Sequence, residues 1–517
     1  YRYRQAQQMA EIAAQDCINV LTRNIRCNGE HQEAVLLYNP SQKPVKGVHV
    51  FELPVAAHPY PNRRFYDANN NSLEVQVLDQ REETFANERL RQLIRFDPMS
   101  VLTAAAEIEV PAFGYTVIYC DNLQSEFHPE RKAYGHDVYY PPLRLSGSQM
   151  VSHNRLDNGA LVVELNSLGL LDVTVKETGK TYRNLHLLED RSDAGEGWNW
   201  RPVRYDSAVY GDNALEQFQV TADGPFCTVW KLTYSVKLPH GLAADGIHRG
   251  EGEKFQRVTT WLTIPKDSEQ LTFRTVVENE TENHRLRVLF PTELKTDCFY
   301  TKTPFDMAKW PVAHPDNRHH VELETKVHPS QGVTWMTDGK DCAAMYAKGL
   351  YEVEVTDNEE RAMALTLFRA AQHETGTCHP EDIKMLRKME FEYALDFGAA
   401  EQAAALVEGE AYRAGVRSYH FAQNPAAGPL EPTGQMLSVT GDRVVSSVFE
   451  DSGRIYVRLY DVSGKDGQCN LTFPRKVKGA QYVNLNLEPQ SPASFDQNSV
   501  TISCPAHKIV TVAVEVE

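Results

Sequence analysis

The sequence predicts a mainly β protein, made of several antiparallel β-sandwich domains and preceded by one helix. Runs of about five to nine residues, rich in β-branched and aromatic side chains, recur along the chain as expected for strands. Glycine, proline and Asn-Gly turns separate these runs. Because a chain of 517 residues is too long for one ordinary hydrophobic core, we expect two to four domains.

The composition indicates a soluble protein with a neutral ligand. The net charge of −17 disfavours nucleic acid and anionic membranes as partners and suits a hydroxyl-rich molecule. No apolar run approaches the ~20 residues of a membrane-spanning helix, and no signal peptide pattern is present. The nine cysteines contain no C-x-x-C pair, which favours reduced thiols. We therefore expect a cytoplasmic protein that does not contact a membrane.

Residues 1–26 predict one amphipathic helix. Its apolar residues recur at spacings of three and four, at Ala6, Met9, Ala13, Cys17 and Leu21. The chain starts at Tyr1, not at a methionine, and has no capping residue ahead of the helix. We expect the chain to be the tail of a longer protein, whose upstream part covers this apolar stripe.

Residues 27–122 predict a small antiparallel sandwich, with expected strands at 35–40, 45–53, 73–78, 105–110 and 115–119. The proline-bearing stretch 121–145 is interpreted as a linker. Residues 123–425 predict a large two-sheet assembly with one late helix at 399–414. Its expected strands are at 161–165, 171–175, 228–236, 258–264, 271–278, 285–290, 351–355, 363–369 and 391–397.

Turns and the end of the chain complete the pattern. Asp157-Asn158-Gly159, Glu177–Lys180 and Asp338–Asp341 predict hairpin turns, and Arg249–Lys254 predicts a flexible charged loop. Residues 426–517 predict a third sandwich, with strands at 443–449, 454–460, 468–473, 481–487 and 509–516.

The stretch from Leu188 to Pro202 resembles a binding site more than any other part of the sequence. Asp193 and Glu196 supply acceptors, while Trp198 and Trp200 supply flat apolar faces. Acceptors beside indole faces suit a sugar, whose hydroxyls need partners and whose ring carbons need a platform. A long loop pinned to a sheet by one buried tryptophan is an equally good interpretation of these residues.

A reaction centre is not visible in the sequence. A glycosidase needs two carboxylates about 5 Å apart if it retains configuration, and the pattern of acidic residues selects no pair. The cluster His314-Pro315-Asp316-Asn317-Arg318-His319-His320 fits a solvated loop better than a metal site. A second group, His128 with His136 and Asp137, is a weaker metal candidate.

Seven segments carry a common pattern in the same order: 1–6, 189–202, 279–292, 348–355, 364–369, 390–395 and 457–460. Together they resemble the C-terminal half of glycoside hydrolase family 38, the α-mannosidases, and most closely its bacterial mannosylglycerate hydrolase-like branch. The stretch 189–202 resembles the family loop D-x-G-D-x-Y-x-Y-x-P, and 279–292 resembles its D-H-R-L-R-V strand with Asn283 in place of the aspartate. Tyr1-Arg2-Tyr3-Arg4-Gln5-Ala6 resembles the helix after the family's His-Asp motif.

The resemblance implies a retaining, zinc-dependent α-mannosidase that hydrolyses α-mannosidic bonds in glycans or mannosylglycerate-like glycosides. It places the zinc ligands and the nucleophilic aspartate on an N-terminal α/β barrel, so it implies that this chain has no catalytic residue, binds no metal and is inactive alone. It also implies that residues 1–26 end a helical bundle and that 123–425 form a galactose-mutarotase-like super-sandwich. An α-mannoside and the missing barrel are the expected partners, and a homo-oligomer is left open.

The resemblance carries one substrate-binding position into this chain. The family tyrosine that reaches the sugar pocket falls on Trp198, which keeps an apolar face but has an N–H donor in place of a hydroxyl. Asp193 and Gly195 keep the family pattern, and Glu196 stands where an aspartate is usual. Trp198, Asp193 and Glu196 are therefore the candidate substrate contacts, while Trp200 is expected in the core.

Two alternatives remain open. One is a non-catalytic carbohydrate-binding sandwich protein. The other is a polysaccharide lyase or mutarotase-like enzyme, which would use Tyr139, Tyr140, His153 and Arg155.

Overall fold

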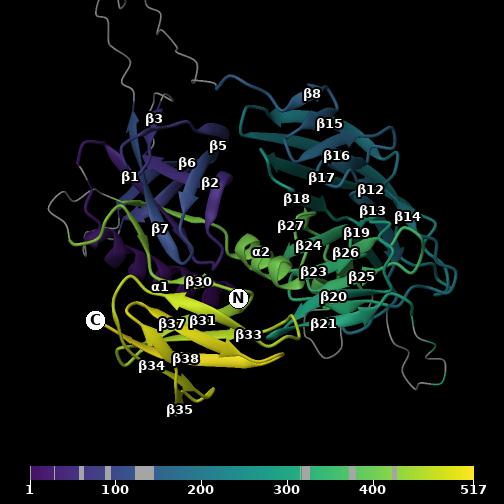
Figure 1. The fold of residues 1–517 in the computed structure, drawn as a ribbon. Coiled ribbons are helices and arrows are strands. Elements are labelled where there is room, and N and C mark those ends of the chain that lie inside the picture. Colours follow the sequence, from purple (N-terminus) through teal and green to yellow (C-terminus); the bar gives the residue numbers. More distant parts are fainter. Residues whose placement is uncertain are drawn as a thin grey trace, which may run out of the picture.

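The computed structural model describes residues 2–27, 29–56, 63–87, 95–122, 145–314, 316, 319, 326–371, 380–421 and 428–517. The described chain is mainly β, and Figure 1 shows three sandwiches around the short helix α2. The predicted fold class is confirmed. No helix in these residues is long and apolar enough to cross a membrane.

Helix α1 runs from Arg2 to Asn24 and packs on the small sandwich through its C-terminal half. Ile18 and Thr22 are buried, and the Thr22 hydroxyl donates to the Ile18 carbonyl at 3.0 Å. Of the predicted stripe, Leu21 packs against this core, while Ala6, Met9, Ala13 and Cys17 are exposed. The described part of the chain therefore leaves most of this stripe uncovered.

The small sandwich is formed by two sheets, ordered β28-β1-β7-β3-β4, with β29 beside β7, and β2-β6-β5. Val35, Leu53 and Leu102 are among the residues of its core. The strands of the two sheets are β1 (Glu33–Asn39), β2 (Val45–Ala56), β3 (Arg63–Tyr66), β4 (Ser72–Leu73), β5 (Gln76–Asn87), β6 (Arg95–Val110), β7 (Gly114–Asn122), β28 (Arg417–Phe421) and β29 (Thr433–Gln435).

The small sandwich is completed from far along the chain, which the sequence did not predict. β28 was placed in the region 123–425, but it pairs antiparallel with β1, with Leu36 opposite Tyr419. Residue patterns do not reveal this pairing, because β1 has the same alternation whichever strand lies beside it. The expected linker at 123–144 lies outside the described residues.

The large domain, here called the super-sandwich (residues 145–396), has a nine-stranded sheet in one layer. Its order is β15-β16-β17-β18-β27-β24-β23-β20-β21. The strands are β15 (Leu215–Ala222), β16 (Cys227–Pro239), β17 (Glu253–Pro265), β18 (Gln270–Glu278), β20 (Cys298–Thr303), β21 (Asp306–Pro311), β23 (Val333–Thr337), β24 (Cys342–Lys348) and β27 (Lys388–Asp396).

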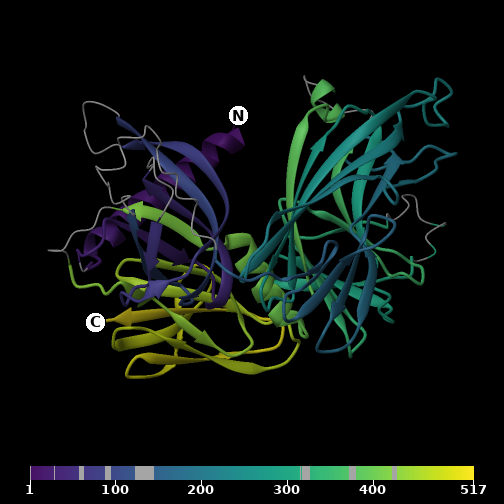
Figure 2. The same ribbon diagram turned by 90° about the horizontal axis from the view of Figure 1, so that it is seen from above.

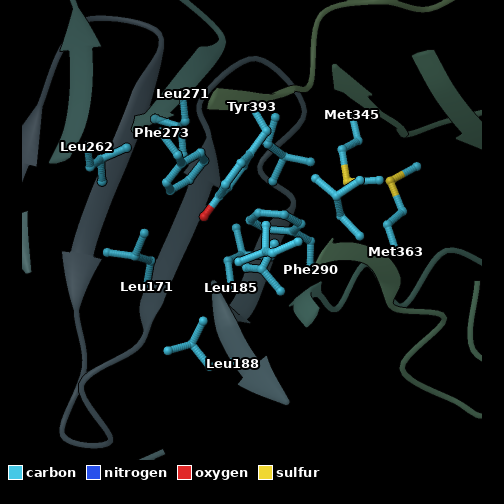
Figure 3. Packing of buried hydrophobic residues seen from close by; sticks show 14 of the residues in the cluster. Leu171, Leu185, Leu188, Leu262, Leu271, Phe273, Phe290, Met345, Met363 and Tyr393 are labelled. Atoms are coloured by element: carbon cyan, nitrogen blue, oxygen red, sulfur yellow. The ribbon is translucent and has the colours of Figure 1, made fainter. Parts of the chain in front are cut away.

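Two smaller sheets pack against the nine-stranded sheet, ordered β12-β11-β10-β9-β8 and β14-β13-β19-β26-β25-β22. Their shared core joins Leu171, Leu188, Phe273, Phe290 and Tyr393 (Figure 3). Their strands are β8 (Met150–Ser152), β9 (Arg155–Asp157), β10 (Leu161–Leu165), β11 (Leu171–Val175), β12 (Thr181–Leu185), β13 (Leu187–Ser192), β14 (Val209–Tyr210), β19 (His284–Phe290), β22 (His328–Pro329), β25 (Glu352–Val355) and β26 (Met363–Ala370); the 3₁₀ helix η2 is Pro380–Lys384.

Helix α2 runs from Gln402 to Ala414 and confirms the late helix predicted at 399–414. It packs on β23 and β24, where a Cβ on Gly409 would lie 2.4 Å from the Val333 side chain. Ala399 is buried ahead of the helix, and its carbonyl accepts the Trp335 indole N–H at 2.7 Å.

The C-terminal sandwich (residues 437–517) has the sheets β30-β33-β37-β36 and β31-β32-β38-β34-β35. Four of the five predicted strands are present, and the strand predicted at 481–487 lies four residues earlier, as β34. The sequence missed the short β30, β35 and β36, and β37. The strands are β30 (Ser438–Thr440), β31 (Val444–Asp451), β32 (Arg454–Tyr460), β33 (Gly467–Thr472), β34 (Val477–Val483), β35 (Pro489–Pro492), β36 (Ser494–Asp496), β37 (Ser499–Cys504) and β38 (Ile509–Val516).

Candidate functional site

The candidate site is the loop from Asp193 to Ser207, which follows β13. β13 is held between β14 and β19, with Glu189 opposite Arg287 and Ser192 opposite His284 in the β19 pairing. The loop therefore leaves the end of a strand whose position in the sheet is fixed from both sides.

Asp193 anchors the start of the loop. Its side chain is 0% exposed, and its carboxylate accepts the Gly195 N–H at 2.9 Å and the Arg369 Nε–H at 2.8 Å. Arg369 also donates to the Glu196 carbonyl at 2.8 Å. In this conformation the Asp193 carboxylate is occupied by the loop itself, so Asp193 shapes the loop and does not face solvent.

The tip of the loop is a tight turn that projects Trp198. The Glu196 N–H donates to the Asn199 carbonyl at 3.2 Å, and the Asn199 amide donates to the Glu196 carboxylate at 3.2 Å. A Cβ on Gly195 would lie 2.0 Å from the Asn199 carbonyl oxygen, so the turn requires glycine at that position. The Trp198 side chain is 80% exposed.

Trp200 lies back on the sheet. Its indole N–H donates to the Ser192 carbonyl at 3.0 Å, and the Arg285 guanidinium carbon lies 3.5 Å from its ring centroid. Arg285 is 1% exposed, and burial, with the neighbouring Arg287, lowers its pKa to about 10. Trp200 is thus partly buried over a cation at the sheet surface, and not fully within the core as predicted.

A row of alternating charges supports the loop from the outer face of the sheet. The Arg287 guanidinium lies between Glu189 of β13, at 2.7 Å, and Glu354 of β25, at 2.5 Å. Burial opposes the charge of Arg287, but the two carboxylates outweigh it and raise its pKa. These paired charges fix β13 relative to β25 across β19 and β26.

The inner face of β13 carries a second network. The His284 ring contacts Asp190 through Nδ1 at 2.5 Å and the Asn279 carbonyl oxygen Oδ1 through Nε2 at 3.0 Å. The Asn279 amide nitrogen donates to the Thr281 and Met385 carbonyls, which fixes Oδ1 as the acceptor. Arg249 forms an ion pair with the same Asp190.

Arg249 corrects the prediction of a flexible charged loop at 249–254. Its side chain is only 6% exposed, because it forms an ion pair with Asp190 on the inner face of β13. The sequence offered no signal for this contact, since the partner lies 59 residues away. The pair ties the turn between β16 and β17 to the strand that leads into the Trp198 loop.

The site therefore offers one exposed indole on a braced turn. Glu189, Asp190 and Asp193 each form an ion pair with an arginine, so none of these three is an unpaired carboxylate available for acid–base chemistry. In the parts of the chain that the structure describes, no group of three His, Cys, Asp or Glu side chains is placed to hold a metal ion. The loop can stack on an apolar face and donate one hydrogen bond from the indole.

The other candidate residues are only partly visible. Pro315, Asn317, Arg318 and His320 of the histidine cluster lie outside the described residues, as do His128, His136, Asp137, Tyr139 and Tyr140. His153 is exposed, and Arg155 lies 3.7 Å from Glu164 as a half-exposed surface pair.

The fold and this loop define a class: a multi-domain β-sandwich protein that presents an indole on a braced turn. Residues 156–377 match the model of the "Glycosyl hydrolases family 38 C-terminal domain". Residues 447–512 match the "Glycosyl hydrolases family 38 C-terminal beta sandwich domain". Together the two models match more than half of the chain, which therefore belongs to glycoside hydrolase family 38; this confirms the predicted family.

Similar proteins agree with this assignment. A "Putative mannosylglycerate hydrolase" of Halalkalibacterium halodurans is 21% identical over 313 residues, which cover 57% of this chain and 34% of the relative. The solved structure of an α-mannosidase from Enterococcus faecalis V583 matches 99% of this chain with a TM-score of 0.82 at 18% identity. A second family 38 structure from Enterococcus faecalis matches 99% with a TM-score of 0.80, also at 18% identity.

These matches extend beyond the present chain. The present chain covers 60% and 62% of the two solved chains, so it spans less than two thirds of each. At 18% identity, the structural likeness shows the fold alone.

Proposed function

We propose that this chain is the C-terminal portion of a retaining, zinc-dependent α-mannosidase. The substrate is an α-mannosidic bond in a glycan or in a mannosylglycerate-like glycoside. The single observation that carries this proposal is the exposed Trp198 on a glycine-dependent turn, inside a region that matches family 38.

The Trp198 loop contributes one wall of the sugar site. The indole face packs against the C–H face of a mannose ring, and its N–H donates to a hydroxyl or to the glycosidic oxygen. Because Asp193 and Arg369 hold the turn before substrate arrives, little conformational entropy is lost when the sugar binds. Glu196, which is partly buried and contacts Asn199, lies beside Trp198 as the second substrate-side candidate.

The reactive groups belong to the N-terminal barrel that the family resemblance implies. Among the described residues no group of three potential metal ligands is present, and Glu189, Asp190 and Asp193 each pair with an arginine. Zinc, when bound by the barrel, supplies electrophilic stabilisation there. The role of this chain is to shape the sugar pocket and to buttress the barrel.

Hydrolysis of an aryl α-mannoside by the full-length protein tests the proposal. We expect activity that a chelator removes and zinc restores, and no activity from residues 1–517 alone. Trp198→Ala should raise the KM by about tenfold, which corresponds to the ~1.4 kcal/mol of one aromatic contact. Trp198→Tyr should recover most of this loss.

Three results would contradict the proposal. Activity that survives metal removal would oppose the zinc assignment, and hydrolysis by the isolated chain would place the reaction centre here. If the full-length protein binds mannosides without hydrolysing them, the non-catalytic carbohydrate-binding alternative replaces the enzyme.

A further inference from the structure

A large cleft lies between the small sandwich and the super-sandwich. It has a volume of about 1910 Å³ and is lined by β2, β5 and β6 on one side, by the outer face of the nine-stranded sheet on the other, and by α2. Figure 2 shows the two sandwiches facing each other with α2 near their closest approach. We propose that this cleft binds a segment of a neutral oligosaccharide, at a site separate from the Trp198 loop.

The sheet side of the cleft carries one continuous row of side chains. Antiparallel pairing places residues of six neighbouring strands in register, in the order Gln219, Lys231, Trp261, Arg274, Glu392 and Lys348. All six side chains line the cleft. Side chains of paired residues point to the same face of a sheet, so the row is a direct result of the register.

Trp261 holds the two neighbouring cations of this row in place. The Arg274 guanidinium carbon lies 3.9 Å from the indole centroid, and the Lys231 ammonium lies 5.4 Å from it. Cation–π contacts restrict both side chains, so their remaining N–H groups are pre-oriented donors. Glu392, which pairs with Lys348 at 2.6 Å, supplies acceptor oxygens in the same row. Fixed donors beside acceptors suit a ligand with many hydroxyl groups.

A second row beside the first supplies hydroxyl groups. Thr263 lies opposite both Val229 and Thr272, and all three line the cleft. Across the cleft, His49 of β2 has no hydrogen-bond partner in the described part of the chain. Burial, and secondarily Lys43, lower the pKa of His49 to about 4, so at neutral pH its ring has one donor and one acceptor nitrogen.

The near balance of positive and negative side chains in the cleft favours a neutral ligand. The whole chain has a net charge of −17, yet the lysines and arginines that line the cleft nearly balance its aspartates and glutamates. Several of these charges pair with one another, as in Arg81 with Glu52 and Lys43 with Glu408. A polyanion or a polycation would gain little from such a surface, whereas a neutral glycan would use its donors and acceptors.

The size of the cleft favours several sugar units. Pockets for small molecules commonly enclose about 300–1,000 Å³, and this cleft is larger. It therefore suits a chain of linked sugars better than one monosaccharide. The type of sugar rests on the proposed function, which makes α-linked mannose the natural choice for a test.

Calorimetric titration of residues 1–517 with linear α-mannan oligosaccharides of increasing length tests this site. We expect affinity to rise with length and then reach a plateau. Lys231→Met combined with Arg274→Met keeps the apolar stems and removes two sets of donors, and should weaken binding of the long oligosaccharides about tenfold or more. Lys237→Met is the matched control, because Lys237 lies on the same strand β16, 54% exposed and outside the cleft.

The proposal is overturned if the chain binds no oligosaccharide, or if the control loses as much affinity as the cleft variant. A second test uses the full-length protein and amine-modifying reagents. If Lys231 is already unreactive without oligosaccharide, another domain covers the cleft, and the proposal is equally overturned. The same holds if Lys231 reacts and oligosaccharides do not protect it. These readouts do not depend on hydrolysis. If the protein hydrolyses the aryl α-mannoside but the cleft binds no oligosaccharide, only this inference fails. If the cleft binds oligosaccharides but the protein hydrolyses nothing, only the proposed function fails.

Discussion

The carboxyl group of Asp396, at the end of β27, is buried between the super-sandwich and α2. It accepts the Tyr346 hydroxyl and the Gly398 N–H, both at 2.8 Å. Burial, reinforced by the nearby Glu408, raises its pKa to about 6, although these two hydrogen bonds and Lys43 oppose the shift. The ionised form is therefore costly in the folded protein.

Asp396→Asn tests this cost. A raised folded-state pKa gives stability that is fully present below the unfolded value near 3.8 and is lost as pH rises through about 6. The wild type should thus lose up to ~3 kcal/mol, relative to Asp396→Asn, between pH 4 and pH 8. Urea unfolding of both proteins at these two pH values measures the difference. A pH-independent difference would show that Asp396 does not titrate in this range.

Single residues differ in how far the sequence alone could predict their roles. Trp198 and Gly195 stand out in a short polar stretch. The structure places Trp198 exposed at the tip of the turn and Gly195 where the turn passes close to the Asn199 carbonyl. The role of Asp193 depends on Arg369, which lies 176 residues away. A contact of that sequence separation has no local pattern, so Asp193 looks like a ligand in the sequence and is an anchor in the fold.

At the scale of elements, the Trp198 loop is one unit whose shape depends on Arg369. The side chain of Arg369 is 15% exposed and binds Asp193 through two nitrogens while it also holds the Glu196 carbonyl. Removal of the Arg369 guanidinium leaves the buried Asp193 carboxylate without a counter-ion.

Arg369→Met should therefore release the loop. We expect faster proteolysis between residues 195 and 201 and, under the proposed function, a higher KM at nearly unchanged kcat for the full-length protein. The local cost is about 3 kcal/mol. Arg369→Lys keeps the charge but cannot bind Asp193 through two nitrogens, so its proteolysis rate and KM should lie between those of the wild type and Arg369→Met. Unchanged cleavage rates in Arg369→Met would refute the anchoring role.

Strands and helices were predictable where their own residues carry the pattern. β10, β11, β32 and α2 have the expected alternation or helical composition and appear within a few residues of the predicted bounds. Short strands such as β36 were missed, because three exposed residues have no apolar alternation. The apolar stripe predicted on α1 is exposed in the described chain except at Leu21, so its cover by another part of the protein stays a prediction.

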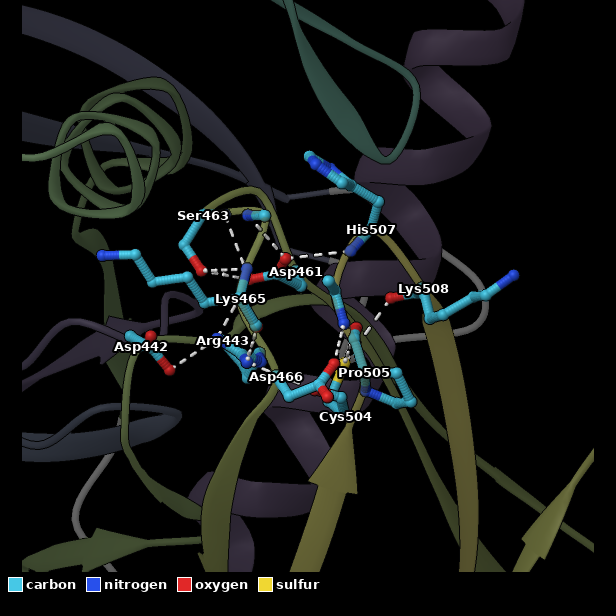
Figure 4. Close-up of polar contacts among 12 residues, drawn as sticks. Asp442, Arg443, Asp461, Ser463, Lys465, Asp466, Cys504, Pro505, His507 and Lys508 are labelled. Carbon is cyan, nitrogen blue, oxygen red and sulfur yellow. Dashed lines mark hydrogen bonds and ion pairs between the residues drawn. The ribbon is translucent and has the colours of Figure 1, made fainter.

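At the scale of the whole molecule, the C-terminal sandwich contains a buried ion pair between Arg443 and Asp461. Arg443 is 0% exposed and contacts Asp461 at 3.0 Å and the Lys465 carbonyl at 2.7 Å (Figure 4). Burial opposes the charge of Asp461, but hydrogen bonds from Ser463 and His507, with Arg443, lower its pKa. Gln42 of the small sandwich bonds the backbone of Arg443 and Val445, which joins the two modules.

Arg443→Met should destabilise the C-terminal sandwich by about 3–5 kcal/mol, since Asp461 remains buried without its cation. Differential scanning calorimetry should show this module unfolding before the super-sandwich. Arg454→Met is the control, because its pair with Glu515 is 40% and 45% exposed and contributes at most ~1 kcal/mol. Equal shifts in both variants would mean that burial does not set the strength of the Arg443 pair.

The sequence by itself determined the mainly β fold, the family and the loop that carries Trp198, because local alternation and ordered motifs lie within short stretches of chain. Only the tertiary structure decided that β28 completes the first sandwich, that arginines neutralise the carboxylates around the loop, and that two sheets face each other across a polar cleft. Each of these features joins residues from distant segments. Burial and register, which bring such residues together, are properties of the folded chain.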